Sequence, residues 1–227
     1  MTQDFKDGAK AAIPIILGYI PVGIAYGMMA KATGLSLFKA LSFSLFVYTG
    51  AGQMAAVTML KQNIAYISIV IAVFILNLRH IIMSTCVMEK MEKTKLPMRL
   101  LLCFGITDEV FAMSMTDKRI EKLTPAFFAG LALFSYLSWN AGSLLGILFS
   151  SILPEVVSKS LGVSLYAMFI GLLVPNMKKS HRLLYIVLLT MIVNFILNQF
   201  LSSSLSMILS TLSCALIGTM LVKEDLS

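Results

Sequence analysis

Arg79 is a permanently charged side chain in the middle of a long apolar run. The run covers residues 67–84 and also holds Asn77 and His80. A stretch this long and this apolar is typical of a membrane-spanning helix. A cation in such a helix costs about 2.5–3.5 kcal/mol on insertion scales, so it normally faces a protein interior or a wet cavity. Arg79 therefore marks a candidate substrate or ion pathway.

Arg79 suits recognition of a carboxylate, because a guanidinium group can donate two parallel hydrogen bonds to it. It can clamp a substrate carboxylate, neutralise an acidic residue, or form a purely structural ion pair with Asp108 or Glu109. His80 can carry a proton, since its unperturbed pKa is close to neutrality, or it can be an uncharged packing residue. On a helix the two side chains point about 100° apart, so we expect them to contact different neighbours.

Asp108 and Glu109 are acidic residues deep within an apolar segment. Burial favours the neutral form of a carboxyl group, so one of them can bind and release a proton. The other can pair with Arg79 or with a substrate ammonium, and either residue can take either role. Alternatively, the pair is solvated in a short loop. We predict that His80, Asp108 and Glu109 are the proton-coupling residues.

The composition is that of an integral membrane protein. Of the 227 residues, 58% are hydrophobic and 13% are charged, against about 25% charged residues in a soluble domain. The net charge of +7 comes mostly from short loops, where it serves topology and contact with anionic lipid rather than nucleic-acid binding. Cys86, Cys103 and Cys214 match no metal motif and are interpreted as small hydrophobic residues. We expect no metal, no cofactor and no cleaved signal peptide.

Apolar segments predict an all-α polytopic membrane protein with seven or eight hydrophobic segments. They lie at residues 11–30, 38–60, 63–88, 98–116, 124–150, 161–177, 182–201 and 204–222. The connections are short, which favours a single transmembrane transporter domain over residues 1–227. The charge pattern leaves the orientation open, because segment 98–116 can either cross the membrane or re-enter it.

Three segments contain residues that favour a break in the helix. Proline removes a backbone donor, and glycine frees the backbone dihedral angles. Residues 18–23 predict a break in the first segment, residues 48–53 in the second and residues 107–109 in the fourth. Non-helical backbone survives at membrane depth where protein or water satisfies it, so these breaks indicate a binding site.

Two parts of the sequence resemble one another weakly. Residues 44–51 can be aligned with 135–142, and residues 18–21 fall opposite 105–108 with a small change of offset. In secondary transporters, interrupted helices in corresponding places of two repeats hold the substrate near the bilayer midplane.

This similarity predicts an inverted repeat of three segments with discontinuous helices. The halves would be residues 9–90 and 96–177, followed by C-terminal helices over residues 182–222. An odd number of spans inverts the second copy relative to the first.

The predicted substrate site combines freed backbone groups with neutral polar and aromatic side chains. A broken helix offers N–H groups at one end and carbonyls at the other, which suits a zwitterion. Amides and hydroxyls add hydrogen bonds, and aromatic rings can form an apolar wall, although such rings also fill gaps or lie at the membrane interface. The candidate substrate-binding residues are Gly18, Pro21, Gly23, Tyr48, Thr49, Gly50, Gly52, Gln53, Asn77, Arg79, Trp139 and Asn140.

Other small and polar residues are better explained by helix packing. Gly27, Gly142 and Gly146 belong to small-xxx-small patterns, which let helices approach closely. Polar residues recur every fourth position from Thr190 to Asn198 and make a stripe on one helix face. We expect this stripe to contact another helix, of this chain or of a partner subunit.

Five short motifs, in this order along the chain, resemble the AzlC family. They are GYIPVGIAYG at 18–27, SLFVYTGAGQ at 44–53, NLRH at 77–80, TDE at 107–109 and LSWNAG at 137–142. Members are the large subunits of branched-chain amino-acid exporters. The resemblance implies ion-driven export of leucine, isoleucine, valine and in some members methionine, across the cytoplasmic membrane of a prokaryote. It also implies a small AzlD-type membrane subunit as partner.

The residue types favour transport over catalysis. The sequence offers no nucleophile with an oriented base, no phosphate-binding loop and no metal-ligand cluster, so we expect that the chain is not an enzyme. Two alternatives to an exporter remain. A passive channel for small zwitterions predicts flux without an ion gradient, and a noncatalytic membrane scaffold predicts charges that only bind a partner.

Overall fold

The computed structural model describes most of the chain, namely residues 3–116, 123–152, 181–201 and 203–223 and the single residues 156, 160, 170, 174 and 177. Almost all of the described residues are helical, and an isolated β-bridge joins Met91 to Leu123. The chain divides into two compact units, Met1–Phe169 (unit 1) and Ile170–Ser227 (unit 2). The predicted all-helical membrane fold is confirmed.

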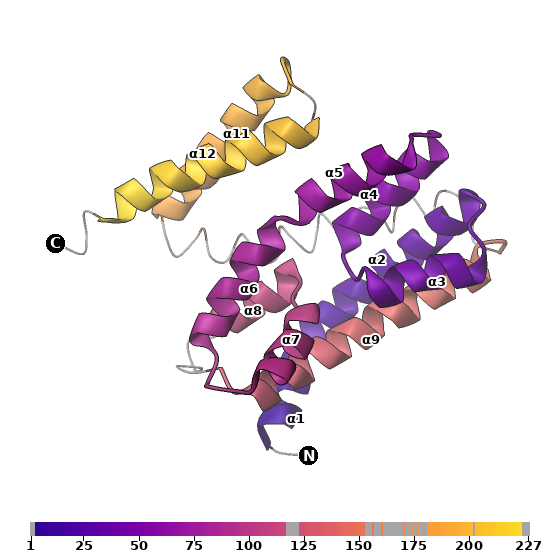
Figure 1. Cartoon of the computed structure of the whole chain (residues 1–227), viewed down its shortest axis with the longest axis horizontal. Helices are drawn as coiled ribbons and strands as arrows, with labels where there is room; N and C mark the ends of the chain where they lie inside the picture. The colour runs from indigo at the N-terminus through magenta and orange to yellow at the C-terminus, as the bar shows by residue number, and fades with distance from the viewer. Residues whose placement is uncertain are drawn as a thin grey trace. The chain divides into compact units, whose positions relative to one another are not determined.

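The helices of unit 1 follow the predicted apolar segments except for α1, which precedes the first of them (Figure 1). They are α1 (Gln3–Ala11), α2 (Ile13–Ala32), α3 (Leu37–Phe46), α4 (Gly50–Lys61), α5 (Tyr66–Asn77), α6 (Arg79–Lys90), α7 (Leu96–Phe104), α8 (Asp108–Thr116) and α9 (Pro125–Phe149). Leu78 separates α5 from α6, which together form one kinked span. Among the described residues, three stretches are long and apolar enough to cross a membrane: α2, α5 with α6, and α9.

Two of the predicted segments are hairpins of half-length helices. We call α3–α4 hairpin A and α7–α8 hairpin B. The four helices have 10, 12, 9 and 9 residues. At 1.5 Å per residue each is about 14–18 Å long, which is roughly half of a 30 Å bilayer core. None of the four can cross the membrane alone.

Hairpin A enters and leaves at the end of unit 1 where α2 ends. Ser44 in α3 and Gln53 in α4 lie side by side, with 3.3 Å between Ser44 Oγ and Gln53 Nε2. Both side chains also bond to α9, Ser44 to Ser143 and Gln53 to Trp139. Because residues before and after the tip reach the same part of α9, α4 returns toward the start of α3, as Figure 1 shows.

Hairpin B enters and leaves at the opposite end. Lys90 Nζ, in the last turn of α6, donates to the carbonyl oxygen of Ser114 near the end of α8, at 2.8 Å. Lys90 O also accepts a hydrogen bond from Leu123 N, just before α9. Since α7 begins shortly after α6 ends, both ends of hairpin B lie beside the end of α6 (Figure 1). Segment 98–116 therefore re-enters, and segment 38–60 does the same from the other end.

The tips of the two hairpins meet near the middle of the three spans. Tyr48, at the tip of hairpin A, packs on Tyr136 with 4.9 Å between ring centroids. Phe104, beside the tip of hairpin B, packs on the same ring at 5.8 Å. Tyr136 lies near the middle of α9, as Tyr19 does in α2 and Arg79 in the α5–α6 span. Two interrupted segments thus converge at mid-depth.

α2 and α9 run parallel with their backbones in direct contact. A Cβ atom on Gly27 would lie 2.3 Å from Ser143 O, and one on Gly146 would lie 2.1 Å from Ile24 O. These distances leave no room for a side chain, so the predicted packing role of Gly27 and Gly146 is confirmed. Gly23 has the same role, because its Cβ would lie 3.0 Å from Ser143 N.

The break predicted in the first segment is wrong. α2 is continuous through Pro21. One proline removes a single backbone hydrogen bond, and the close packing of Gly23 and Gly142 between α2 and α9 holds the helix axis. The breaks predicted in the second and fourth segments are confirmed, at residues 47–49 and 105–107.

The alignment on which the predicted repeat was based fails at these breaks. Residues 18–21 are helical where 105–108 contain a break, and 44–51 contain a break where 135–142 are helical. Much of the second predicted half lies outside the described residues, so the inverted repeat itself stays a prediction.

Unit 2 contains a pair of helices, α11 (His181–Leu197) and α12 (Ser203–Lys223). Asn194 Nδ2 donates to Ser210 Oγ at 3.2 Å, and Ser206 Oγ donates to Asn194 O at 2.9 Å. The expected contact of the polar stripe with another helix is thus confirmed for Asn194, within this chain. The predicted segment 161–177 lies almost entirely outside the described residues.

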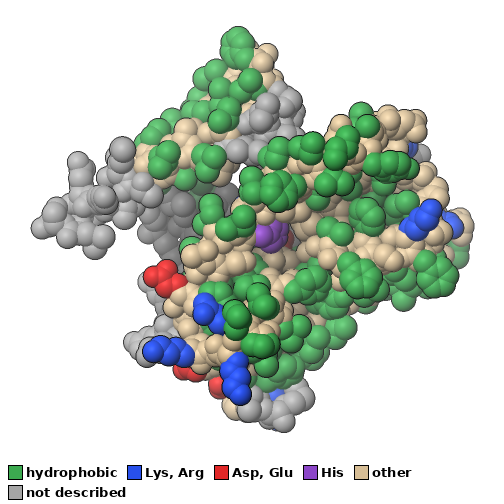
Figure 2. All heavy atoms as spheres, in the orientation of Figure 1, with side chains coloured by type: hydrophobic (Ala, Val, Ile, Leu, Met, Phe, Trp, Pro, Cys, Tyr) green, Lys and Arg blue, Asp and Glu red, His purple; other side chains and the backbone are tan. Residues whose placement is uncertain are grey.

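Basic residues are concentrated at the end of unit 1 where α1 begins and α6 ends. The described residues of this kind there are Lys6, Lys10, Lys90, Lys93, Lys95 and Arg99. The opposite end carries Lys31, Lys39 and Lys61. Figure 2 shows hydrophobic side chains over most of the visible surface of unit 1, with charged groups gathered toward its ends.

We expect the end rich in basic residues to face the cytoplasm, because loops that remain inside carry an excess of Lys and Arg. In a chain without its native cysteines, a cysteine replacing exposed Lys95 should escape a membrane-impermeant maleimide in intact cells. A cysteine replacing exposed Lys61 should react. The reverse pattern would invert the orientation, and equal labelling would contradict the placement of these residues at opposite ends.

Candidate functional site

A small cavity lies between the two hairpin tips and the middle of the spans. It is lined by Tyr19, Tyr48, Thr49, Gly50, Ala51, His80, Thr107, Asp108, Glu109 and Trp139. Its volume is about 20 Å³, which accommodates about one water molecule. Pockets that hold small molecules are much larger, at about 300–1,000 Å³. The structure therefore has this cavity in a closed state.

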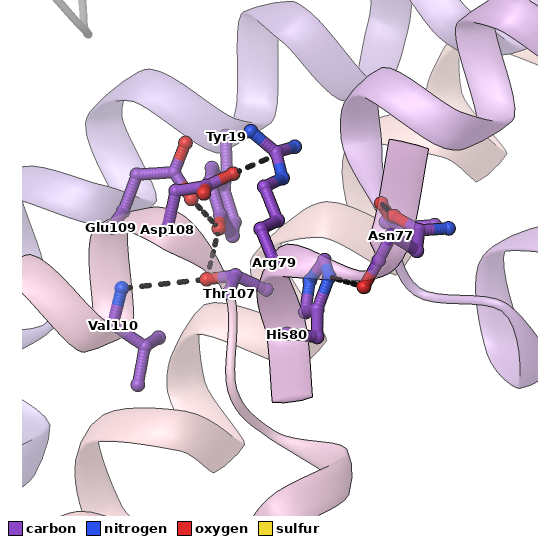
Figure 3. Close-up of polar contacts among 9 residues, drawn as sticks. Tyr19, Asn77, Arg79, His80, Thr107, Asp108, Glu109 and Val110 are labelled. Atoms are coloured by element: carbon purple, nitrogen blue, oxygen red, sulfur yellow. Dashed lines mark hydrogen bonds and ion pairs between the residues drawn. The ribbon is translucent and has the colours of Figure 1, made fainter. Parts of the chain in front are cut away.

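The first residues of two helices line the cavity. α4 begins at Gly50, after the extended residue Thr49, and α8 begins at Asp108, after Thr107. Thr107 caps α8, with 3.4 Å between Val110 N and Thr107 Oγ1 (Figure 3). Helix N-termini carry unpaired N–H groups and a partial positive charge. This part of the cavity therefore favours an anionic group.

Arg79 and Asp108 form an ion pair beside the cavity. Arg79 Nη2 lies 3.0 Å from Asp108 Oδ2 (Figure 3), and the two side chains are 38% and 25% exposed. The predicted pairing of Arg79 with an acidic residue is confirmed, with Asp108 as the partner. Arg79 Nε is buried and has no hydrogen-bond partner among the described residues. The guanidinium group therefore retains a donor for another acceptor.

Glu109 has different surroundings from its neighbour Asp108. Its side chain is only 4% exposed, and its Oε2 accepts a hydrogen bond from Tyr19 OH at 2.5 Å. Tyr19 OH also lies 2.7 Å from Thr107 Oγ1. Within the described ranges Glu109 forms no ion pair, because the nearby cation, Arg79, is paired with Asp108. The two adjacent carboxyl groups thus differ in both burial and partner.

Asn77 and His80 connect the kink between α5 and α6 to hairpin A. Thr49 Oγ1 donates to Asn77 Oδ1 at 2.9 Å, and His80 Nδ1 lies 3.2 Å from Asn77 O. A Cβ on Gly52 would lie 3.0 Å from Asn77 Nδ2, so glycine permits this close approach. His80 lines the cavity while Arg79 turns toward hairpin B (Figure 3). Their predicted divergence is confirmed.

Gln53 holds Trp139 in the cavity wall. Trp139 Nε1 donates to Gln53 Oε1 at 2.9 Å, and Gln53 Nε2 donates to Ser44 Oγ at 3.3 Å. Ser44 Oγ donates in turn to Ser143 Oγ at 2.8 Å. Gln53 and Ser44 are fully buried. Gln53 therefore positions the indole ring instead of lining the cavity itself.

The cavity brings together many of the predicted site residues, but not all of them. The predicted residues that line it are Tyr48, Thr49, Gly50, His80, Asp108, Glu109 and Trp139. Those that contact a lining residue are Gly52, Gln53, Asn77 and Arg79. Gly18, Pro21, Gly23 and Asn140 do not line the cavity, although Gly23 packs against the backbone of the lining residue Trp139.

These four residues have other surroundings. Gly18 and Pro21 belong to the continuous helix α2 and therefore offer no broken backbone. Gly23 packs against α9. Asn140 Nδ2 donates to Tyr136 O, one turn earlier in its own helix, at 2.8 Å. The reason for including Gly18, Pro21 and Gly23, an interruption of the first segment, is absent because α2 is continuous. Asn140 was included as a neutral hydrogen-bonding side chain, and that role stays a prediction.

Tyr19 and Thr107 were missed as site residues. Thr107 could have been found, because a threonine directly before two acidic residues is typical of a helix N-terminus. Tyr19 gives a weaker signal, namely a hydroxyl in the middle of an apolar span. Its role depends on the fold, which brings α2 next to α8.

Comparison with known proteins identifies the family. The profile described as AzlC protein matches residues 14–153. The chain belongs to the AzlC family. The matched region includes every helix from α2 to α9, and therefore the whole cavity. The resemblance found in the five motifs is confirmed.

Proteins with similar sequences include several that are named as membrane proteins. An uncharacterized membrane protein of Archaeoglobus fulgidus is 38% identical over 179 residues, which are 78% of each chain. Inner membrane protein YgaZ of Escherichia coli is 28% identical over 79% of this chain and 76% of its own. Branched-chain amino acid transport protein AzlC of Bacillus subtilis is 25% identical over 78% of this chain and 70% of its own. No solved structure matches the chain.

We expect Gln53→Leu to destabilise the protein by about 1–3 kcal/mol, because it leaves the buried Trp139 N–H without an acceptor. The matched control is Gln62→Leu, at the exposed end of the same helix, which should be nearly neutral. Thermal unfolding of the purified protein in detergent measures both. Equal unfolding temperatures for the two variants would show that the buried amide contributes nothing.

Proposed function

We propose that this chain exports branched-chain amino acids, namely leucine, isoleucine and valine, with methionine as a further substrate. Export would be coupled to an ion gradient across the cytoplasmic membrane of a prokaryote. The observation that carries the proposal is a pair of opposite charges, Arg79 and Asp108, beside a cavity at mid-depth. The kinship with a branched-chain amino acid transport protein supports the substrate class.

Opposite charges beside one cavity suit a zwitterion. The guanidinium group of Arg79 can pair with the substrate carboxylate, for which its Nε–H is a free donor among the described contacts. The N-terminus of α4 adds to the attraction for a carboxylate, whereas the first turn of α8 already carries Asp108 and Glu109. Asp108 can pair with the ammonium group. In the closed state the two side chains neutralise each other, and the substrate would separate them.

Aromatic rings supply surroundings for an apolar side chain. Tyr19, Tyr48 and Trp139 line the same cavity as the polar groups, and Tyr19 packs edge-on against Trp139 with 5.4 Å between ring centroids. One methylene in an apolar pocket is worth only about 1–3 kcal/mol. Such a wall would therefore discriminate weakly among leucine, isoleucine and valine.

Movement of the hairpins would open the cavity to one side at a time. Hairpin A reaches the cavity from one end of unit 1 and hairpin B from the other, so each can act as the gate for its own side. Alternating access in many transporters is a similar motion of elements around a fixed midplane site. The small cavity volume is consistent with both gates being closed.

A small AzlD-type membrane subunit would complete the transporter. Large hydrophobic side chains along α5 are exposed in this chain, including Tyr66, Ile67, Val70 and Phe74. This surface is available to the subunit as well as to lipid. The proposal of this partner comes from the family.

We expect radiolabelled leucine to exchange across proteoliposomes that contain the chain together with the small subunit. Arg79→Gln should lower exchange roughly ten- to hundredfold, because a hydrogen bond to a charged group is worth about 1.5–3 kcal/mol. Arg99→Gln, at an exposed position of α7, is the matched control and should exchange as the parent does.

Analogues that lack one charge provide a second control for the same experiment. 4-Methylpentanoate has no ammonium group, and 3-methylbutylamine has no carboxylate, so neither should compete with leucine. Absence of any amino-acid exchange by the parent complex would overturn the proposed function. Flux that is insensitive to an imposed ion gradient would favour a passive channel.

A further inference from the structure

We propose that Glu109, held by Tyr19 and Thr107, carries the coupling proton, while Asp108 serves the substrate and Arg79. This assignment rests on the proposed transport function and deepens it. The sequence allowed either carboxyl group to take either role. The different contacts of Asp108 and Glu109 distinguish their roles.

The first argument is the difference in counter-charge. Asp108 forms the ion pair with Arg79 at 3.0 Å. Glu109 is more deeply buried and forms no ion pair within the described ranges. An ionised carboxylate without a cation is costly in apolar surroundings, whereas the neutral acid needs only hydrogen bonds. Changing the protonation of Asp108 would break an ion pair, but changing that of Glu109 would not.

The second argument is that the surrounding hydroxyl groups can accommodate Glu109 in either protonation state. Tyr19 OH lies 2.5 Å from Glu109 Oε2 and 2.7 Å from Thr107 Oγ1. When Glu109 is ionised, Tyr19 donates to it and accepts from Thr107. When Glu109 is protonated, it donates to Tyr19, which then donates to Thr107. A hydroxyl can do both, because it has one proton and two lone pairs.

The third argument is access for the proton. Glu109 lines the cavity, whose volume of about 20 Å³ accommodates about one water molecule. When one hairpin opens, a hydronium ion on that side can transfer a proton to the carboxylate, so that one O–H bond of the hydronium ion breaks and one O–H bond of the carboxyl group forms. When the other hairpin opens, that carboxyl O–H bond breaks and the proton passes to water on the opposite side, which becomes hydronium.

The titratable and charged groups around Glu109 come from every neighbouring element. α2 supplies Tyr19, the tip of hairpin A supplies Tyr48, α6 supplies Arg79 and His80, and α8 supplies Asp108. Tyr136 of α9 packs against the ring of Tyr48. Of these, His80 is the rival carrier. Its Nδ1 lies 3.2 Å from the carbonyl oxygen of Asn77, an arrangement that a neutral imidazole with an Nδ1–H satisfies.

The proton also bears on the contact between α2 and hairpin B. Tyr19 belongs to α2, which is fixed on α9 by glycine contacts, whereas Thr107 and Glu109 belong to the tip of hairpin B. The Tyr19–Glu109 hydrogen bond joins the fixed and the hinged element (Figure 3). An ionised acceptor makes this bond stronger than a neutral one. Protonation would therefore loosen hairpin B.

The test compares Glu109→Gln with Glu89→Gln, an exposed position on α6, in proteoliposomes of the two-subunit complex. Leucine exchange without a gradient measures substrate movement, and leucine accumulation under an imposed pH gradient measures coupling. We expect Glu109→Gln to lose the response to pH, since glutamine cannot titrate, and to retain measurable exchange, so that accumulation falls much more than exchange. Glu89→Gln should keep both.

Each contrary result has a separate meaning. If the parent complex exchanges nothing, the transport function itself fails. If the parent exchanges leucine and Glu109→Gln still responds to the pH gradient, the assignment of the proton to Glu109 is overturned. Loss of exchange in Glu109→Gln, with folded protein by size-exclusion chromatography, overturns it too. If coupling persists in Glu109→Gln and is lost in His80→Gln, His80 is the proton carrier instead of Glu109.

A second pair of variants keeps the proposal testable if Glu109→Gln does not fold. Tyr19→Phe removes the hydroxyl that contacts Glu109, and Tyr26→Phe removes a buried hydroxyl of the same helix that donates to Ala40 O at 2.9 Å. Tyr19→Phe keeps the ring in the cavity wall and should lower pH-driven accumulation several-fold more than it lowers exchange. Equal behaviour of the two variants would overturn the role of the Tyr19–Glu109 contact.

Discussion

Interrupted backbone at bilayer depth must find partners inside the protein, because lipid offers none. This constraint explains why the two hairpin tips meet each other instead of lying at separate places. Beside the break in hairpin A, Leu45 O accepts a hydrogen bond from Tyr136 OH of α9. At the break in hairpin B, Thr107 Oγ1 accepts from Val110 N. Side-chain hydrogen bonds also join the tips to the spans, between Thr49 and Asn77 and between Thr107 and Tyr19. Thr49, Thr107 and Tyr19 line the cavity.

The closely packed helices α2 and α9 support the two hairpin tips. Glycines let the two backbones touch along their length, so neither helix can shift without a clash. Tyr19 and Trp139, which project from this pair, line the cavity. The hairpins contribute the opposite wall through half-length helices. The closely packed pair thus provides the support against which, in the proposed mechanism, the two short hairpins would move.

The sequence predicted the chemistry of the site better than its topology. An arginine and two carboxylates in apolar runs indicate a polar interior wherever the chain places them, and the ion pair of Arg79 with Asp108 follows from that requirement. The small polar residues 48–53 and 107–109 likewise mark true breaks. Hydropathy cannot distinguish a crossing from a re-entrant hairpin, because both are apolar along their length.

Pro21 and Tyr19 show where local sequence is insufficient. Pro21 favours a break, yet α2 stays intact because tertiary packing against α9 outweighs one lost hydrogen bond. Tyr19 resembles any aromatic residue in a membrane helix until the fold places Thr107 and Glu109 beside its hydroxyl. Both outcomes depend on neighbours distant in sequence, which periodicity and propensity do not contain.

The small volume of the closed cavity bears on how the cell keeps its membrane potential. A membrane potential of 100 mV does about 2.3 kcal/mol of work on each elementary charge that crosses. A continuous water-filled path would short-circuit that potential, and the space between the tips accommodates about one water molecule. In the proposed transporter the two closed hairpin tips would therefore act as electrical insulation, and a substrate would pass only during a brief, one-sided opening.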